Sequence, residues 1–139
     1  VQDMTDKVLG AQAGSSGYLN FEGQPELLKN RVKDQKANQY QSFNEALIDL
    51  KNDRIDALLI DRVYANYYLQ SEGILNDYNV FSAGFESEAF AVGVRPADKT
   101  LLDALNQAFI SLYQEGKFQE ISQKWFGEDV ATSQVKNQE

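Results

Sequence analysis

The 139-residue sequence contains neither cysteine nor histidine. Without cysteine there is no disulfide and no thiolate nucleophile, and without histidine neither Ser-His-Asp nor Cys-His catalysis is possible. The usual zinc ligand sets are missing for the same reason. Most enzyme chemistry near neutral pH therefore lacks its commonest groups, and we expect no catalytic residue, no metal and no cofactor in this chain.

Basic residues are also scarce, because 21 Asp and Glu residues stand against 13 Lys and Arg residues. The resulting net charge of -8 repels a phosphate backbone, and no stretch clusters Lys or Arg into a compensating patch. No window reaches the roughly 18 to 20 consecutive apolar residues of a membrane span, and residues 1–7 lack the features of a signal peptide. We therefore expect a soluble, globular chain with no nucleic-acid partner.

What the sequence does contain is a regular alternation of short apolar runs with amphipathic stretches. Apolar runs predict strands at residues 8–11, 37–40, 55–60, 78–81 and 89–94. Helical spacing predicts helices from the 14–17 turn to about residue 33, then at 43–50, 62–72, 100–116 and 118–126. Two capping boxes are predicted, one from Ser42 and Glu45 and one from Thr100 and Asp103. The alternation favours an α/β fold in which three layers, α/β/α, surround a mostly parallel sheet.

Two features of this pattern point to a ligand site. Gly14-Ser15-Ser16-Gly17 follows the first strand and opens a helix, where it offers backbone N–H groups and two hydroxyls to an anion. Asp61 follows the third strand and brings a negative charge to the same edge of the sheet. Such a pair is complementary to a zwitterion, for example the carboxylate and ammonium of a free amino acid.

Each of these features also has a purely structural interpretation. A Gly-Ser-Ser-Gly sequence is often only a flexible turn, and Asp61 stands where an N-cap of the following helix would be. Gln41, at the end of the second strand, is a third candidate ligand residue, although a Gln beside a capping Ser is commonly just solvated. The aromatic residues at helical spacing are predicted to pack rather than to contact ligand.

The ordered set of segments resembles the second half of the amino-acid-binding proteins of ABC importers, the family-3 solute-binding proteins with the type II periplasmic-binding-protein fold. The resemblance is carried by residues 7–17 (KVLGAQAGSSG), 40–52, 54–61 (RIDALLID), 90–95 (FAVGVR) and 112–127, which end in KWFG. It implies two α/β lobes that close on an amino acid. It also implies that Gly14, Ser15 and Ser16 bind the ligand carboxylate and that Asp61 pairs with the ligand ammonium.

The same resemblance implies a division of the chain. Residues 7–83 match lobe 2, residues 84–88 the returning hinge and residues 89–127 the segment that completes lobe 1, while residues 128–139 are predicted to be a flexible tail. Most of lobe 1 is absent, so the strand predicted at 89–94 would lack its neighbours. Exposed backbone and apolar surface of that kind favour a dimer.

The function implied is capture of a polar L-amino acid outside the cytoplasm and its delivery to the permease of an ABC importer, by a periplasmic protein or a cell-surface lipoprotein. One alternative keeps the fold and makes it the amino-acid-sensing domain of a membrane receptor. A second alternative is a receiver-type phosphoacceptor domain, which also places an Asp after an apolar strand. That domain needs further acids at the end of its first strand, where this chain has Gln12 and Ala13.

Overall fold

The computed structural model describes residues 1–136 and divides them into two compact units. Unit 1 comprises residues 1–62 and 79–86, and unit 2 comprises residues 63–78 together with the chain from residue 87 onward. Unit 1 holds β1 (Leu9–Gln12), α1 (Ser16–Gly23), β2 (Ala37–Tyr40), α2 (Phe43–Lys51) and β3 (Ala57–Leu59), with short 3₁₀ turns at Gln2–Met4 and Lys33–Gln35. Nearly all of α3 (Arg62–Ser71) belongs to unit 2, with a 3₁₀ turn at Leu75–Asp77, α4 (Lys99–Gln114), α5 (Lys117–Phe126) and α6 (Ser133–Lys136).

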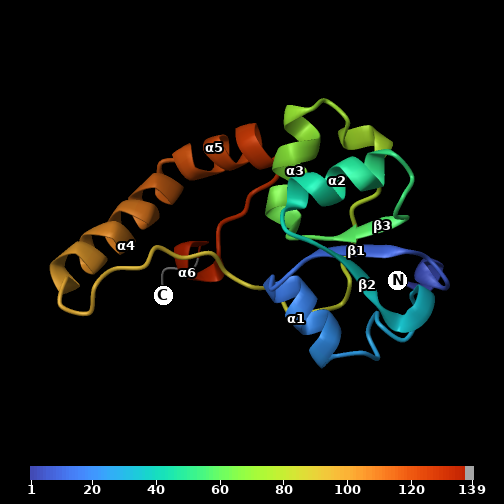
Figure 1. Cartoon of the computed structure of the whole chain (residues 1–139). Coiled ribbons are helices and arrows are strands. Elements are labelled where there is room, and N and C mark those ends of the chain that lie inside the picture. Colours follow the sequence, from blue (N-terminus) through green and yellow to red (C-terminus); the bar gives the residue numbers. More distant parts are fainter. Residues whose placement is uncertain (137–139) are drawn as a thin grey trace. The chain divides into compact units, whose positions relative to one another are not determined.

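The centre of unit 1 is a parallel three-stranded sheet in the order β2-β1-β3 (Figure 1). Helix α1 covers one face of this sheet and α2 the other, which gives the three layers that the sequence predicts. The chain runs from β1 to β2 over one face and from β2 back past β1 to β3 over the opposite face. Placing the two helices on opposite faces gives both connections the same hand, as parallel sheets require.

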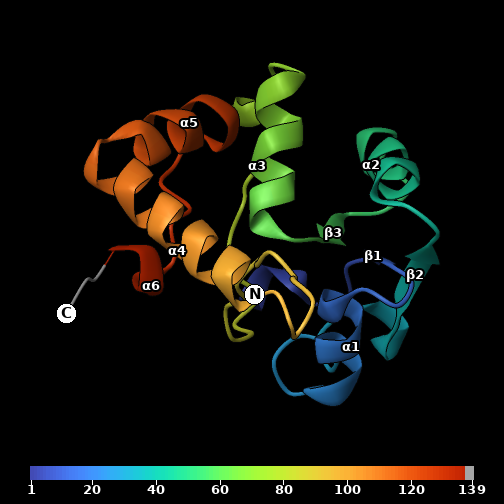
Figure 2. The same cartoon turned by 90° about the vertical axis from the view of Figure 1, so that its left-hand side faces the viewer.

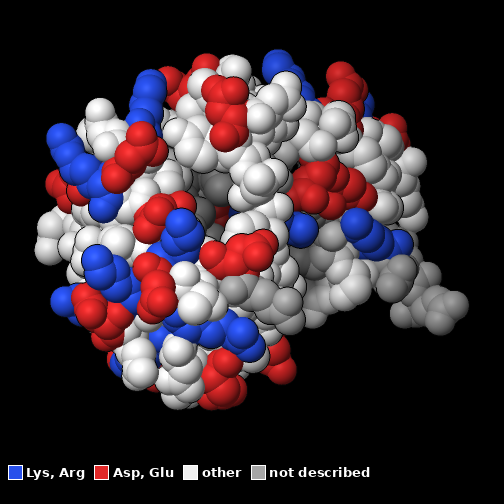
Figure 3. All heavy atoms as spheres, turned by 90° about the vertical axis from the view of Figure 1, so that its right-hand side faces the viewer, with Lys and Arg blue, Asp and Glu red and all other residues white. Residues whose placement is uncertain are grey.

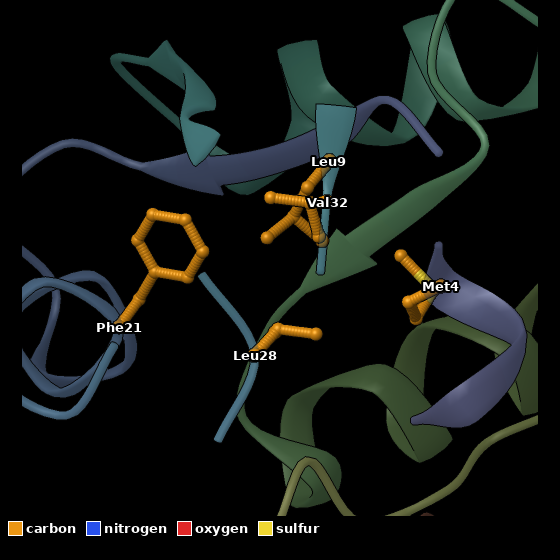
Figure 4. Close-up of a cluster of buried hydrophobic side chains, with 5 residues drawn as sticks. All are labelled: Met4, Leu9, Phe21, Leu28 and Val32. Carbon is orange, nitrogen blue, oxygen red and sulfur yellow. The ribbon is translucent and has the colours of Figure 1, made fainter. Parts of the chain in front are cut away.

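One face of the sheet packs on a hydrophobic cluster of five buried side chains, drawn in Figure 4. These side chains are Met4, Leu9, Phe21, Leu28 and Val32, all at most 6% exposed. Burying a side chain of this kind stabilises a fold by about 1.5 to 3 kcal/mol relative to leaving it exposed. The cluster therefore holds α1 and the loop that follows it against the sheet.

The helix predicted to continue to residue 33 is wrong beyond Gly23. Gln24 has φ −130° and ψ 66°, outside the helical region, and Pro25 follows it. A proline disfavours the helical conformation of the residue before it, which explains why the helix ends here. Leu28 and Val32 are nevertheless buried, because residues 25–31 form turns that carry them into the core.

On the opposite face of β1, Gly10 leaves room for neighbouring side chains. A Cβ atom at Gly10 would lie 2.6 Å from Ile55 Cδ1 and 3.0 Å from Tyr40 Cε2, so the glycine is what lets both side chains approach the strand. The Tyr40 hydroxyl in turn donates a 2.8 Å hydrogen bond to Asp49 of α2. This contact anchors α2 directly to the sheet.

The capping box at the start of α2 is present with one change of partner. Ser42 Oγ accepts a 3.3 Å hydrogen bond from Glu45 N–H, as predicted. The Glu45 carboxylate accepts from the N–H of Gln41, at 3.1 Å, and so reaches one residue beyond the capping position. Two otherwise free backbone amides are satisfied in either arrangement.

Unit 2 is helical, and α3 ends in a Schellman motif. Gly73 adopts φ 69°, Ile74 N–H donates to the Leu69 carbonyl at 2.9 Å and Gly73 N–H to the Gln70 carbonyl at 3.1 Å. Only a residue that tolerates the left-handed region fits this position, as the glycine predicts. Gly116 and Gly127 stand at the two ends of α5, and both adopt the left-handed conformation, with φ 76° and 73°.

Side-chain contacts join the helices of unit 2, which Figure 2 shows from a second direction. Gln70 of α3 donates to the Lys124 carbonyl of α5 at 3.1 Å, and Tyr67 lies 6.2 Å from Trp125 between ring centroids. Phe118 of α5 packs against Phe109 of α4 at 6.4 Å. No membrane crossing is built into these elements, since no helix among residues 1–136 is both long and apolar enough.

Three further predictions differ from the structure. Residues 78–81 and 89–94, predicted as strands, lie outside any helix or strand, and Phe90 is 73% exposed. A strand needs a neighbour to satisfy its backbone, and the described chain offers these residues none. The second predicted capping box is also wrong, because α4 begins at Lys99 and Thr100 therefore lies inside the helix. Asp98 stands at the cap position, and its carboxylate accepts a 2.6 Å hydrogen bond from Arg95 Nε.

The predicted tail contains an element that the sequence does not indicate, the short helix α6. Asp129 accepts hydrogen bonds from Tyr113, Lys136 and the Ala131 N–H. Burial works to raise the pKa of the Asp129 carboxyl, but these bonds outweigh it and hold the pKa below its usual value. Residues 137–139 of that tail lie outside the described residues, and its flexibility stays a prediction.

The contact between Tyr40 and Asp49 makes stability depend on pH. A hydrogen bond from Arg54, at 2.7 Å, and then the bond from Tyr40 lower the pKa of the Asp49 carboxyl from its ordinary 3.8. A carboxyl whose pKa is depressed by folding stabilises the protein above its unfolded pKa, and this contribution is lost as pH falls through the folded pKa.

We predict that wild-type protein loses more stability between pH 6 and pH 2 than the Asp49→Asn variant does, because only wild type has to protonate this carboxylate. Urea denaturation at a series of pH values measures the difference. Arg54→Met, which removes the stronger partner and keeps the acid, should show an intermediate pH dependence. Parallel curves for wild type and Asp49→Asn would contradict the prediction.

Candidate functional site

The candidate residues lie along one edge of the sheet in unit 1. The parallel register pairs Gln12 with Tyr40 and Ala11 with Leu59, so all three strands end at the same edge. Gly14 follows the central strand, Gln41 follows β2 and Asp61 follows β3. The chain goes from β1 to β2 on one side and β3 lies on the other side, and such a switch point, here between β1 and β3 at the carboxyl edge, is where open parallel sheets bind ligands.

The 14–17 loop turns the chain from β1 into α1. Gly14 adopts φ 71°, a conformation that favours glycine, and Ser15 N–H donates to the Gln12 carbonyl at 3.2 Å. Ser15 is the N-cap of α1: its Oγ accepts from Tyr18 N–H at 3.1 Å and donates to the Gln12 carbonyl at 2.9 Å. The Ser15 hydroxyl therefore both donates to and accepts from backbone groups of its own loop and helix.

Ser16 differs from Ser15 in what its groups contact. It is exposed, it is the first residue of the helix, and within residues 1–136 its hydroxyl makes no hydrogen bond. The N–H groups of Ser16 and Gly17 are the first two of α1 and have no acceptor among the described residues. They provide two donors and a hydroxyl at the positive end of a helix dipole, which suits an anion.

Asp61 is half-buried and immediately precedes α3. The start of α1 lies close to the end of β3, because a Cβ atom at Gly17 would lie 3.5 Å from Leu59 Cγ. The start of α1, which follows β1, and Asp61, which follows β3, thus come after neighbouring strands at one edge of the sheet. A ligand with one negative and one positive group could therefore meet the start of α1 with the first and Asp61 with the second.

Gln41 is exposed, and its backbone groups make hydrogen bonds. Its N–H donates to Glu45, and its carbonyl accepts a 3.1 Å hydrogen bond from Gln12 Nε2. Sequence reasoning noticed Gln41 and overlooked Gln12, which bridges the two loops. The signal available was its place as the last polar residue of a buried strand.

An open hollow of about 470 Å³ lies elsewhere in unit 1. Its lining includes Asp6, which precedes β1, and Asp34 and Gln35, which precede β2. It therefore sits by the amino ends of the strands, away from the candidate site. Among residues 1–136, no group of three or more acidic side chains is arranged to hold a metal ion.

Charged side chains of both signs are interspersed over the face shown in Figure 3. In unit 1 several of them form exposed ion pairs, including Lys7 with Asp56 at 3.6 Å and Arg54 with Asp49 at 2.7 Å. Exposed pairs of this kind are each worth about 0 to 1 kcal/mol. The surface in this view carries no extended patch of Lys and Arg side chains.

Comparison with known proteins identifies the family. The sequence model for bacterial extracellular solute-binding proteins, family 3, matches residues 25–128. This chain belongs to that family. Its members are described as solute-binding proteins.

Curated members of the family include amino-acid-binding proteins. The ABC transporter arginine-binding protein 1 of Escherichia coli is 30% identical over 128 residues, which cover 89% of this chain and 49% of the relative. The L-cystine-binding protein TcyJ of E. coli is also 30% identical, over 90% of this chain and 45% of the relative. This chain spans about half the length of the curated relatives it matches.

Solved structures of family-3 proteins show the same fold. A substrate-binding protein of an ABC uptake transporter from Streptococcus pneumoniae, with bound histidine, is 75% identical with a TM-score of 0.77 over 94% of this chain and 53% of that one. A polar amino acid ABC uptake transporter substrate-binding protein from Streptococcus thermophilus is 61% identical with a TM-score of 0.79, over 98% of this chain and 52% of that one. The type II periplasmic-binding-protein fold predicted from sequence is confirmed, and so is the shortness of this chain relative to its family.

The two adjacent serines should respond differently to truncation. We predict that Ser15→Ala lowers the free energy of unfolding by about 1 kcal/mol, because it removes the N-cap of α1. Ser16→Ala should change it by less than about 0.5 kcal/mol, since that hydroxyl is exposed and unengaged. Urea denaturation of both variants measures this, and equal losses at the two positions would show that the cap has been assigned to the wrong serine.

Proposed function

We propose that the protein containing this chain binds a free polar L-amino acid outside the cytoplasm and delivers it to the permease of an ABC importer. The observation that supports the proposal is that α1, whose first two amides have no acceptor among residues 1–136, and Asp61 follow neighbouring strands at one sheet edge. Those groups complement the carboxylate and the ammonium that every free amino acid carries. Support comes from relatives named for arginine and cystine and from a similar structure with bound histidine.

Each candidate residue has a distinct role in this proposal. Ser16 and the Gly17 N–H hold the ligand carboxylate, Gly14 supplies the turn that exposes them, and Ser15 orients the loop through its cap. Asp61 pairs with the ligand ammonium. Gln41 flanks the site on the β2 side.

The proposed division of the chain follows from the same interpretation. Residues 7–83 would form lobe 2, residues 84–88 the returning hinge and residues 89–127 the part that completes lobe 1. The remainder of lobe 1 would close over the ligand and select its side chain. This chain therefore recognises the part of the ligand that is common to all amino acids.

We predict that Asp61→Ala and Ser16→Ala each weaken amino-acid binding by the full two-lobed protein at least tenfold, roughly 1.4 kcal/mol. Asp61→Ala removes the partner of the ligand ammonium, and Ser16→Ala removes the hydroxyl donor to the ligand carboxylate while leaving the two backbone amides in place. Calorimetry with a panel of the twenty amino acids measures the effect. Asp103→Asn, which changes an exposed carboxyl on α4, is the control and should bind as wild type does. The proposal fails if no amino acid binds the wild-type protein, or if Asp61→Ala folds and binds normally.

An amino-acid-sensing domain of a membrane receptor would use the same site. The gene sequence on either side of this chain separates the two functions. A signal peptide with a lipid-attachment cysteine indicates an importer component held at the cell surface, and a signal peptide without that cysteine indicates a free periplasmic one. A membrane span joined to a signalling domain would instead indicate a receptor.

We further propose that this chain, when produced alone, forms dimers. Phe90, Val92, Ile121 and Trp125 of unit 2 are between 48% and 73% exposed, and exposed apolar side chains favour association where they form a continuous patch. The relatives' extra length supplies material that could cover such side chains in the full protein.

We predict that the isolated chain dimerises with a dissociation constant that the double variant Phe90→Ser/Val92→Thr raises at least tenfold, because less apolar area is buried. Sedimentation equilibrium over a concentration series measures it. A chain that stays monomeric at millimolar concentration would contradict the prediction. The full two-lobed protein is the control, and it should be monomeric over the same range.

A further inference from the structure

Gln12, the last residue of β1, makes hydrogen bonds in two directions. Its backbone carbonyl accepts both the N–H of Ser15, at 3.2 Å, and the Oγ–H of Ser15, at 2.9 Å. Its side-chain Nε2 donates to the Gln41 carbonyl at 3.1 Å. One half-buried residue thus holds the loop after β1 and the loop after β2 at the same time.

The bonds made by Gln12 continue into both neighbouring helices. On one side Ser15 Oγ accepts the Tyr18 N–H in the first turn of α1, at 3.1 Å. On the other side Gln41 N–H donates to the Glu45 carboxylate in the first turn of α2, also at 3.1 Å. A chain of hydrogen bonds therefore connects the first turns of α1 and α2, and Gln12 stands at its middle.

We propose that Gln12 is a positioning residue for the amino-acid site, and this rests on the function proposed above. Through its two bonds it sets where the unengaged amides of Ser16 and Gly17 lie relative to the β2 side of the edge. A shift of the loop would misdirect those amides, and hydrogen bonds weaken steeply as their angle departs from linear. Gln12 acts through Ser15 and need not touch the ligand.

The chemistry of this position accounts for a glutamine. The Gln41 carbonyl needs a donor at the end of a side chain with two methylene groups. An asparagine would fall one methylene short, a methionine would have the length without the donor, and a glutamate would place a negative charge beside both the carbonyl and the proposed carboxylate subsite.

Gln39 provides a matched control. Its Nε2 donates to the Tyr18 hydroxyl at 3.0 Å, so it too links the sheet to α1 through one side-chain hydrogen bond. That bond bypasses the 14–17 loop. A merely structural role for Gln12 predicts that the two glutamines behave alike, whereas a positioning role predicts that only Gln12 affects binding.

The experiment compares Gln12→Met and Gln39→Met in the full two-lobed protein. Calorimetry, first with histidine and then with the twenty-amino-acid panel, should show binding weakened about five- to tenfold by Gln12→Met and less than about twofold by Gln39→Met. Urea midpoints should fall by similar amounts in the two variants. In the ligand-saturated protein, hydrogen exchange at the Ser16 and Gly17 amides should quicken in Gln12→Met alone.

The outcomes separate the two proposals. If wild type binds an amino acid while Gln12→Met binds as tightly as Gln39→Met, the positioning role is wrong and the proposed function stands. If wild type binds no amino acid, the function proposed for the site fails and the positioning role fails with it. Should Gln12→Met not fold, Gln12→Asn keeps a polar amide that cannot reach the Gln41 carbonyl; the same loss of binding is expected, and normal binding would overturn the role.

Discussion

The parallel pairing of β1 with a strand on each side is the constraint on which the rest of unit 1 depends. Leu9 pairs with Ala37 on one side and with Ala57 on the other, so three strands from separate parts of the sequence begin and end together. The alternation of side chains along β1 then divides the layers. Leu9 faces the cluster under α1, and Gly10 faces the side chains under α2. Both the core and the site are consequences of this one register.

Local signals were enough to predict the elements that are local in origin. The limits of β2 and the start of α2 agree with the sequence because Ser42 and Glu45 cap the helix within one turn. Gly73, Gly116 and Gly127 mark helix ends because only a left-handed residue fits there. Pro25 was a stop signal as well, but the apolar spacing of Leu28 and Val32 obscured it, since a buried turn and a buried helix face can share that spacing.

The errors concern features that need a partner far away in the chain. Residues 89–94 have the composition of a strand, but composition supplies no neighbouring strand. At the site, the edge and its residues were predictable from order alone, whereas the difference between Ser15 and Ser16 depends on which residue begins the helix. The place of Gln12 at the end of a buried strand was visible in the sequence, but its bond to Gln41 was not, because that side-chain acceptor lies 29 positions away.

The role proposed for the backbone amides at the start of α1 has a consequence for how such proteins diverge. A main-chain N–H is the same chemical group whatever residue carries it, so the recognition of a carboxylate can persist while most side chains are replaced. This chain is 30% identical to a protein named for arginine and 30% identical to one named for cystine, and such divergence is compatible with one shared way of binding the ligand carboxylate. Changes of substrate during evolution would then be confined to residues outside this loop. The loop itself could keep its role while the specificity of the protein changes.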